Sequence, residues 1–139
     1  MIKLKIGGKV IDTKERFNDG TWVRVMPSGD AVEIDLEFKM RSRHSDVGEK
    51  ISRAAIRKHQ AAIQKAKGLV FADPDQEERD QIDFVTALAV GWRGKSIAED
   101  DGSVPAFSAA ECTAFLMQEK WMVPLLDRAT NEDARFLQV

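Results

Sequence analysis

Hydrophobic and polar residues alternate most regularly between residues 31 and 41. Every second position there is apolar, namely Val32, Ile34, Leu36, Phe38 and Met40. This two-residue period is typical of a strand that is buried on one face. The preceding residues 21–26 are rich in β-branched and aromatic side chains, and residues 27–30 (Pro-Ser-Gly-Asp) favour a turn. Together the two runs predict a β-hairpin.

Two shorter apolar runs lie closer to the start of the chain. Residues 3–6 and 9–11 flank Gly7 and Gly8, a pair that favours a tight turn. We expect two short strands here, at an edge of a sheet or frayed.

From Val47 onward the apolar period lengthens to that of an α-helix. We expect this first helix to stop at Gly68, because glycine is common just past a helix end. Its apolar side consists of Ile51, Ala55, Ala62, Ile63 and Ala66. Its opposite side carries Lys50, Arg53, Arg57, Lys58 and Lys65.

Three further helices are predicted after residue 72. Asp73 and Pro74 form a cap and a first turn for a helix that should run to about Gly91, followed by a loop to Pro105. Ser108 and Glu111 have the spacing of a capping box and open the next helix. The last helix should begin within residues 121–124 and continue through Phe136.

The order of these elements predicts an α+β fold. An N-terminal antiparallel β-hairpin or small sheet (residues 1–41) precedes a bundle of three to four α-helices (residues 47–139). A chain of 139 residues has the usual size of one domain, so we expect a single domain over residues 1–139.

Charge is distributed unevenly along the chain, although its formal net charge is only -2. Residues 39–67 hold nine Lys or Arg against two acids, and residues 73–83 hold six acids against one Arg. The basic helix of residues 50–67 would suit a nucleic-acid backbone or an acidic protein, or else a solvated face beside the acidic helix. The sequence pI near 5.7 argues against a dedicated nucleic-acid binder.

Few side chains in this sequence are candidates for catalysis or metal binding. His44 and His59 have no partner motif, and Cys112 is either a thiol activated at a helix start or a small buried residue. The acidic run of residues 99–103 lacks EF-hand spacing and predicts a solvated turn. We therefore expect no catalytic residue, metal or cofactor.

No apolar run is long enough to span a membrane, which suggests a cytoplasmic protein.

Several short motifs follow one another in a characteristic order. They are Asp19-Gly20-Thr21-Trp22-Val23, then Val90-Gly91-Trp92-Arg93-Gly94, Asp100-Asp101-Gly102, Val104-Pro105-Ala106-Phe107-Ser108 and finally residues 131–136 (Asn-Glu-Asp-Ala-Arg-Phe). In this order, and over most of the chain, the sequence resembles the tail assembly chaperones of long-tailed bacteriophages and prophages. Residues 41–72 match that family only as a basic helical stretch.

This resemblance implies a function without catalysis. Members of the family bind the tape-measure protein and recruit major tail-tube subunits in the host bacterial cytoplasm, are absent from the finished virion, and tend to self-associate as homo-oligomers. Two other functions remain open from the sequence. One is a minor tail or tail-completion protein that stays in the virion, and the other is a nucleic-acid-binding regulator that uses the basic helix of residues 50–67.

Two groups of residues follow from the motifs and the helix pattern. Architectural roles are expected for Trp92, Asp101, Gly102, Phe107, Ser108 and Glu111. Candidate partner anchors on the terminal helix are Trp121, Leu125, Leu126, Phe136 and Leu137. The alternative for this second group is that the same side chains close the protein's own core.

Overall fold

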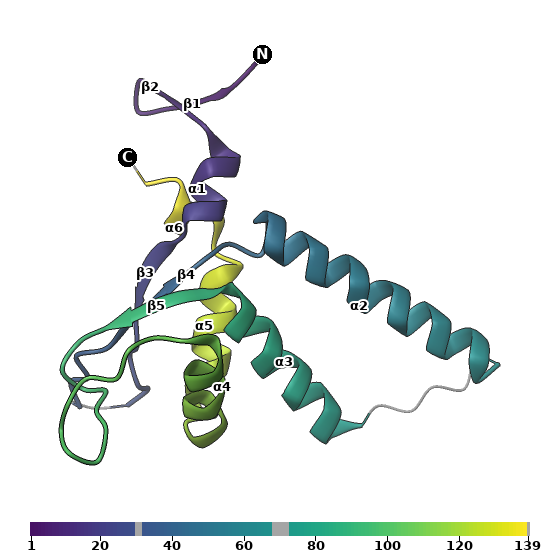
Figure 1. Cartoon of the computed structure of the whole chain (residues 1–139). Helices are drawn as coiled ribbons and strands as arrows, with labels where there is room; N and C mark the ends of the chain where they lie inside the picture. The colour runs from purple at the N-terminus through teal and green to yellow at the C-terminus, as the bar shows by residue number, and fades with distance from the viewer. Residues whose placement is uncertain (30–31, 68–72, 139) are drawn as a thin grey trace.

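The protein has an α+β fold in which a small antiparallel sheet packs against helices (Figure 1). The computed structural model describes residues 1–29, 32–67 and 73–138. Its strands are β1 (Leu4–Ile6), β2 (Lys9–Ile11), β3 (Thr21–Arg24), β4 (Glu37–Met40) and β5 (Ala89–Arg93). Its helices are α1 (Thr13–Asp19), α2 (Asp46–Lys65), α3 (Pro74–Leu88), α4 (Ala109–Gln118), α5 (Met122–Thr130) and α6 (Asp133–Phe136).

The β3–β4 hairpin confirms the alternating pattern, but the paired segment is shorter than predicted. β4 is the central strand of the order β3-β4-β5, and Val23 lies opposite Phe38. Phe38 and Met40 are fully buried, whereas Val32 is 67% exposed. One further hairpin hydrogen bond lies outside the paired strands, in which Val25 N donates to Leu36 O at 3.0 Å. The next residue, Asp35, bonds to the loop after β5, where Ser96 N donates to Asp35 O at 2.9 Å. The regular ladder therefore ends at Glu37.

The helix expected to reach Gly91 ends at Leu88. The predicted helix end was therefore wrong, because the residues after Leu88 form a short strand. Ala89 leaves the helical region with φ -76° and ψ 134°, and residues 89–93 form β5 against β4. Phe38 pairs with Trp92 in this ladder. A short apolar run can belong to a helix or to a buried strand. Here residues 89–93 form a strand because the free edge of β4 provides backbone partners for them.

Two other differences concern helix ends. The β-rich part contains the unpredicted helix α1, which Asp12 caps by accepting a hydrogen bond from Glu15 N at 3.1 Å. The single terminal helix is instead two helices, because α5 stops at Thr130 and α6 begins at Asp133. Thr130 Oγ1 donates to the carbonyl of Asp127 at 2.7 Å, which provides a local end for α5.

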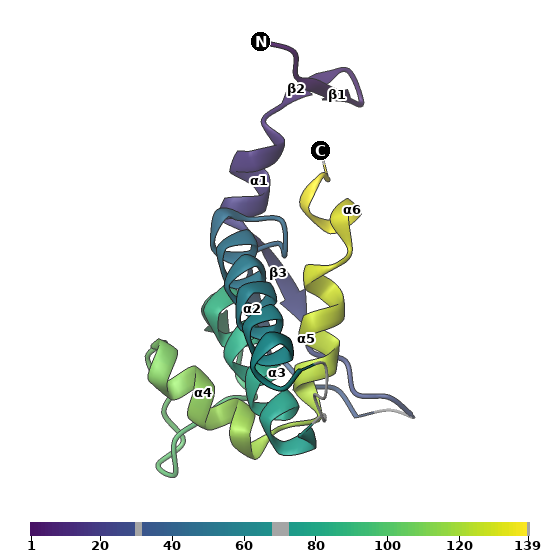
Figure 2. The same ribbon diagram turned by 90° about the vertical axis from the view of Figure 1, so that its right-hand side faces the viewer.

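The hydrophobic core lies between the three-stranded sheet and helices α3, α4 and α5. α3 contributes a stripe of Ile82, Val85 and Leu88, all no more than 1% exposed. The short β1–β2 hairpin forms at the predicted residues, but it is a separate two-stranded sheet and not an edge of the sheet β3-β4-β5. It stands away from the core together with the N-terminus (Figures 1 and 2). α2 also leaves the core, and it diverges from α3 along its length (Figure 1).

Candidate functional site: the groove between α2 and α3

Helix α2 is anchored to the rest of the protein at its first turn. Ser45 caps it by accepting a hydrogen bond from Gly48 N at 3.1 Å. Gly48 is the one fully buried residue of this helix, and a Cβ there would lie 2.3 Å from the carbonyl oxygen of Arg43. Close approach of the two backbones therefore depends on the absence of a side chain at Gly48.

Polar contacts from α1 hold the same turn. Lys14 Nζ lies 3.0 Å from the Asp46 carboxylate, and Asn18 Oδ1 accepts from Asp46 N at 2.8 Å. The hydrogen bond from Lys14 is the largest of the effects that lower the pKa of Asp46 below its ordinary value. Lys14 and Asp46 are exposed to solvent, whereas Val47 in the same turn is half-buried and packs against the hydrophobic core. The anchor therefore combines polar contacts with the packing of Val47 and Gly48.

The remainder of α2 is exposed, including most of the apolar side that the sequence predicts. Ala55, Ala62 and Ile63 are exposed, and Ile51 is half-buried. Ile56 and Ile63 are 56% and 38% exposed. An amphipathic helix normally buries its apolar stripe, because burial contributes most of its stability. In α2 this stripe is half-buried at Ile51 and exposed at Ala55, Ala62 and Ile63.

The exposed stripe forms one wall of a groove of about 600 Å³. The α2 wall consists of Ile51, Ala54, Ala55 and Lys58. The α3 wall consists of Asp80, Gln81, Asp83 and Phe84. Both walls come from helices that diverge from a common junction at the sheet, and the groove is closed at that junction (Figure 1).

Arg43 and Asp127 close the groove where α2 meets α3. Arg43 Nη2 lies 3.3 Å from Asp127 Oδ1, and its guanidinium stacks 5.1 Å from the centre of the Phe84 ring. Gln81 Nε2 donates to the other oxygen of Asp127 at 3.5 Å. These contacts join α3, α5 and the segment before α2, so the closed end is rigidly built.

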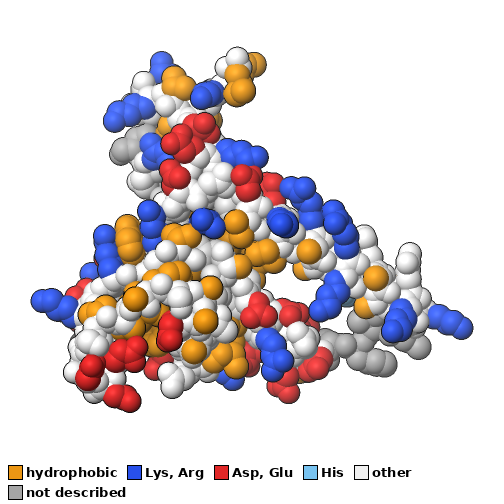
Figure 3. All heavy atoms as spheres, viewed as in Figure 1, with side chains coloured by type: hydrophobic (Ala, Val, Ile, Leu, Met, Phe, Trp, Pro, Cys, Tyr) orange, Lys and Arg blue, Asp and Glu red, His pale blue; other side chains and the backbone are white. Residues whose placement is uncertain are grey.

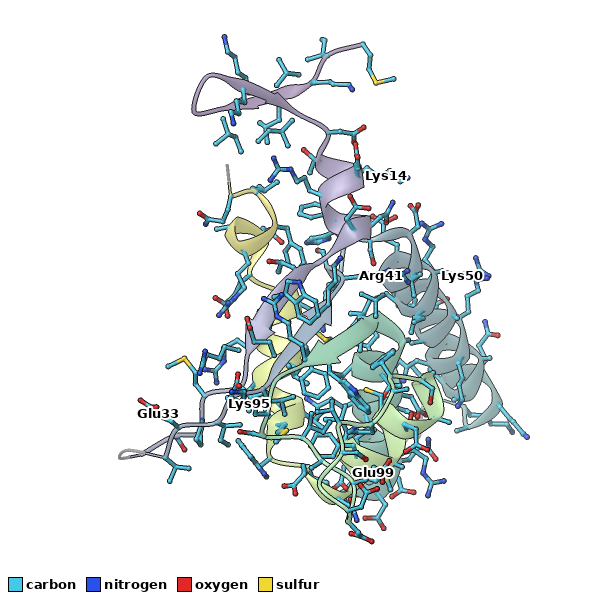
Figure 4. The ribbon with its side chains drawn as sticks, turned by 60° about the vertical axis from the view of Figure 1, so that its left-hand side comes forward. Lys14, Glu33, Arg41, Lys50, Lys95 and Glu99 are labelled. Atoms are coloured by element: carbon cyan, nitrogen blue, oxygen red, sulfur yellow. The ribbon has the colours of Figure 1, made fainter. Side chains whose placement is uncertain are left out.

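The charges of α2 and α3 do not neutralise each other directly. Within residues 46–65 and 74–88, which the structure describes completely, no ion pair joins the two helices. Figure 3 shows Lys and Arg side chains along α2 and Asp and Glu side chains gathered over α3. Lys58, placed by the sequence on the basic side, lines the groove beside Ala55. Lys50 instead projects away from the sheet (Figure 4).

The predicted partner anchors do not form one surface. Leu126 and Phe136 are 0% and 3% exposed and lie inside the protein, where Phe136 meets the Phe17 ring edge-on at 5.9 Å. For these two, the structure favours the alternative of core packing. Leu125 and Leu137 are half-buried, and Trp121, 42% exposed, donates from Nε1 to Glu119 at 2.8 Å at the start of α5.

The motif residues around Trp92 form an architectural cluster. Trp92 Nε1 donates to the carbonyl of Pro105 at 2.9 Å, and its ring meets Phe107 edge-on with centres 5.0 Å apart. Gly94 has φ +127°, and a Cβ there would lie 2.0 Å from the carbonyl oxygen of Asp35. These contacts hold the long loop after β5 against the sheet.

The other motif residues build the turn and the helix start that the sequence predicts. Asp101 Oδ1 accepts from Ser103 N at 2.9 Å and from Ser103 Oγ at 2.6 Å, and these bonds lower the pKa of Asp101. Gly102 adopts φ +87° in this turn. Ser108 caps α4 by accepting from Glu111 N at 3.1 Å.

The remaining polar candidates are not assembled into a chemical centre. Cys112 is fully buried, and burial raises the pKa of its thiol to about 11. His44 lies 3.4 Å from Asp133 on the surface, and His59 is exposed on α2. In the described part of the chain, no three His, Cys, Asp or Glu side chains are placed to hold a metal ion.

Comparisons with protein families, curated proteins and solved structures find no match for this chain. None of the helices within the described ranges is both long and apolar enough to cross a membrane. The groove between α2 and α3 was not among the sites predicted from the sequence. The sequence did predict the apolar stripe of α2, but its exposure in the described part of the chain depends on how α2 and α3 are placed relative to each other.

Proposed function

We propose that this protein is a noncatalytic tail assembly chaperone that binds apolar helical segments of a phage tape-measure protein and recruits tail-tube subunits. The resemblance in the ordered motifs supports the choice of family. The groove between α2 and α3 supports the first of these partners, because it is a candidate binding site for a helix.

The observation that carries the proposal is the unpacked apolar stripe of α2. Ile51, Ala55 and Ala62 lie on one side of a 20-residue helix, yet Gly48 is its one buried residue. The opposite wall ends in the aromatic ring of Phe84. An amphipathic helix that lies along this groove would cover apolar atoms of both walls, as in other helix-in-groove complexes.

The proposed occupant is a helix of another protein with an apolar stripe and mixed charges. A strongly basic partner would be repelled by Lys58, and a strongly acidic one by Asp80 and Asp83. A tape-measure protein before tube assembly is such a partner, because its long helices expose apolar stripes until the tube encloses them. A chaperone that covers these stripes would keep the protein soluble.

Co-expression with the neighbouring tape-measure gene tests the proposal. We expect a higher soluble yield of the tape-measure protein and a complex that survives gel filtration. Ala55→Glu places a carboxylate in the α2 wall and should abolish the complex while leaving the circular dichroism spectrum unchanged. Gln60→Glu adds the same group to the outer side of α2 and serves as the matched control. An unchanged yield without a complex would refute the proposal.

Two further measurements separate the remaining functions. Loss of the complex in Trp121→Glu but not in Ala55→Glu would place the partner surface at α5 and not at the groove. Stoichiometric copies of this protein in purified virions would identify a structural tail component. Pull-down of the major tail-tube protein with the tape-measure complex tests recruitment.

A further inference from the structure

The two walls of the groove carry opposite charge. The sequence expectation that Lys58 and Lys65 lie opposite the apolar side was wrong, because residues 51, 55, 58, 62 and 65 follow the spacing of one helix side. Of these two lysines, Lys58 lines the groove. On α3, Asp80 and Asp83 line the groove, and Glu77 precedes Asp80 by one turn. A bound helix would therefore meet cations on one side and carboxylates on the other.

These charges are available to a ligand. Lys58, Lys65 and Asp83 make no ion pair within the described residues, and Asp80 accepts a hydrogen bond from the neutral Gln76 side chain at 2.8 Å. Arg43 and Asp127 at the closed end already pair with each other, with Arg43 Nη2 3.3 Å from Asp127 Oδ1, although the buried Arg43 Nε has no hydrogen-bond partner among the described residues. The charge difference between the walls therefore rests on Lys58 opposite Asp80 and Asp83, which line the groove.

A polarised groove distinguishes the two directions of a bound helix. When the apolar stripe of the helix faces the floor, reversing the helix exchanges its left and right flanks. A helix with carboxylates on one flank and Lys or Arg on the other can therefore satisfy both walls in one direction only. In the reverse direction, both flanks meet like charges.

From this polarity, and on the basis of the function proposed above, we infer that the groove selects helices whose apolar stripe has an acidic flank toward α2 and a basic flank toward α3. The same polarity sets the direction in which the partner helix lies. Flank charge is thus a specificity determinant, in addition to the apolar contact that provides affinity.

A second copy of this chain fits the groove less well than such a partner. Its own exposed stripe is that of α2, in which Lys58 and Lys65 lie among the apolar residues. That helix would suit the acidic α3 wall but would bring lysines against the lysines of the α2 wall. Charge complementarity therefore favours a different protein with flanks of both signs.

The inference can be tested with two synthetic helices of about 18 residues, which is five turns. Both have the same composition and a Leu/Ala stripe, and both carry a nitroxide at the N-terminus. They differ only in the exchange of their Glu and Lys flanks. The readout is the broadening of the protein's amide NMR signals, either at the closed end of the groove, near Arg43 and Phe84, or near the C-terminal end of α2 at Lys65.

We expect the two spin-labelled peptides to broaden the amide NMR signals at opposite ends of the groove. A third peptide with Lys on both flanks should bind about fivefold more weakly at low salt, because two or three exposed charge pairs each contribute little. This difference should shrink at high salt. The triple variant Lys58→Glu/Asp80→Lys/Asp83→Lys should reverse the end that each peptide broadens, and Lys50→Glu on the outer side should not.

The outcomes separate this inference from the proposed function. Binding in which each peptide broadens both ends equally would overturn the inference and leave helix binding intact. No binding of any peptide would also overturn it, and the co-expression experiment would then decide the proposed function independently. A dimer in light scattering that the peptides do not dissociate would show a second copy in the groove and overturn the inference.

Discussion

Helices α2 and α3 are neighbours in the chain and are both amphipathic, but they use their apolar sides differently. α3 buries Ile82, Val85 and Leu88 beneath the sheet and α4. α2 buries Gly48 alone and exposes Ile56 and Ile63. The same sequence pattern thus stabilises the protein's own core in one helix, while in the next helix its apolar side stays largely exposed within the described residues. A hydrophobic period indicates that a face will be covered, but not by which chain.

Substitution of buried and exposed apolar residues tests this contrast most strongly. Phe38→Ala removes a fully buried ring that contacts Trp92 and Phe115, and we expect it to lower the free energy of unfolding by about 3–5 kcal/mol. Ile56→Ala in α2 should change it by less than about 0.5 kcal/mol. Urea denaturation measures both values. A comparable loss for Ile56→Ala would mean that α2 packs against the core in solution.

Glycine substitutions test how the loop after β5 is held. Gly94→Ala should destabilise the protein by about 1–3 kcal/mol, because φ is +127° and the new Cβ would overlap the carbonyl oxygen of Asp35. Gly29→Ala is the control, since Gly29 also has positive φ but nothing lies within 4 Å of its Cβ position. Thermal unfolding compares the two variants. Equal effects would show that backbone conformation alone matters.

The smallest effect concerns the polar anchor of α2. The pKa of Asp46 is lowered from 3.8, so its contribution is present above that value and is lost as pH falls through the folded-state pKa. Lys14→Ala should raise this pKa and speed amide exchange in the first turn of α2, without changing the core. NMR titration measures the pKa. Arg57→Ala, three turns away, is the control, and an unchanged pKa in Lys14→Ala would contradict the proposed anchor.

The candidate site was harder to predict than the fold. Two helix caps, at Ser108 and Asp73, and the turn at Gly102 were predicted correctly. These features depend on neighbours within a few residues. The terminal helix was considered as a partner surface because Leu126 and Phe136 are large and apolar. Their burial depends on α1, the sheet and α3, which are distant in sequence and leave no signal in that segment.

By itself the sequence determined the β3–β4 pairing, most helix starts and the α+β class, because hydrophobic period and capping act through neighbouring residues. Tertiary structure decided that residues 89–93 complete the sheet, since the open edge of β4 supplies their hydrogen bonds. It also decided that the stripe of α2 faces a groove. Amphipathicity is a property of one helix, whereas burial requires a second surface at the right angle and distance.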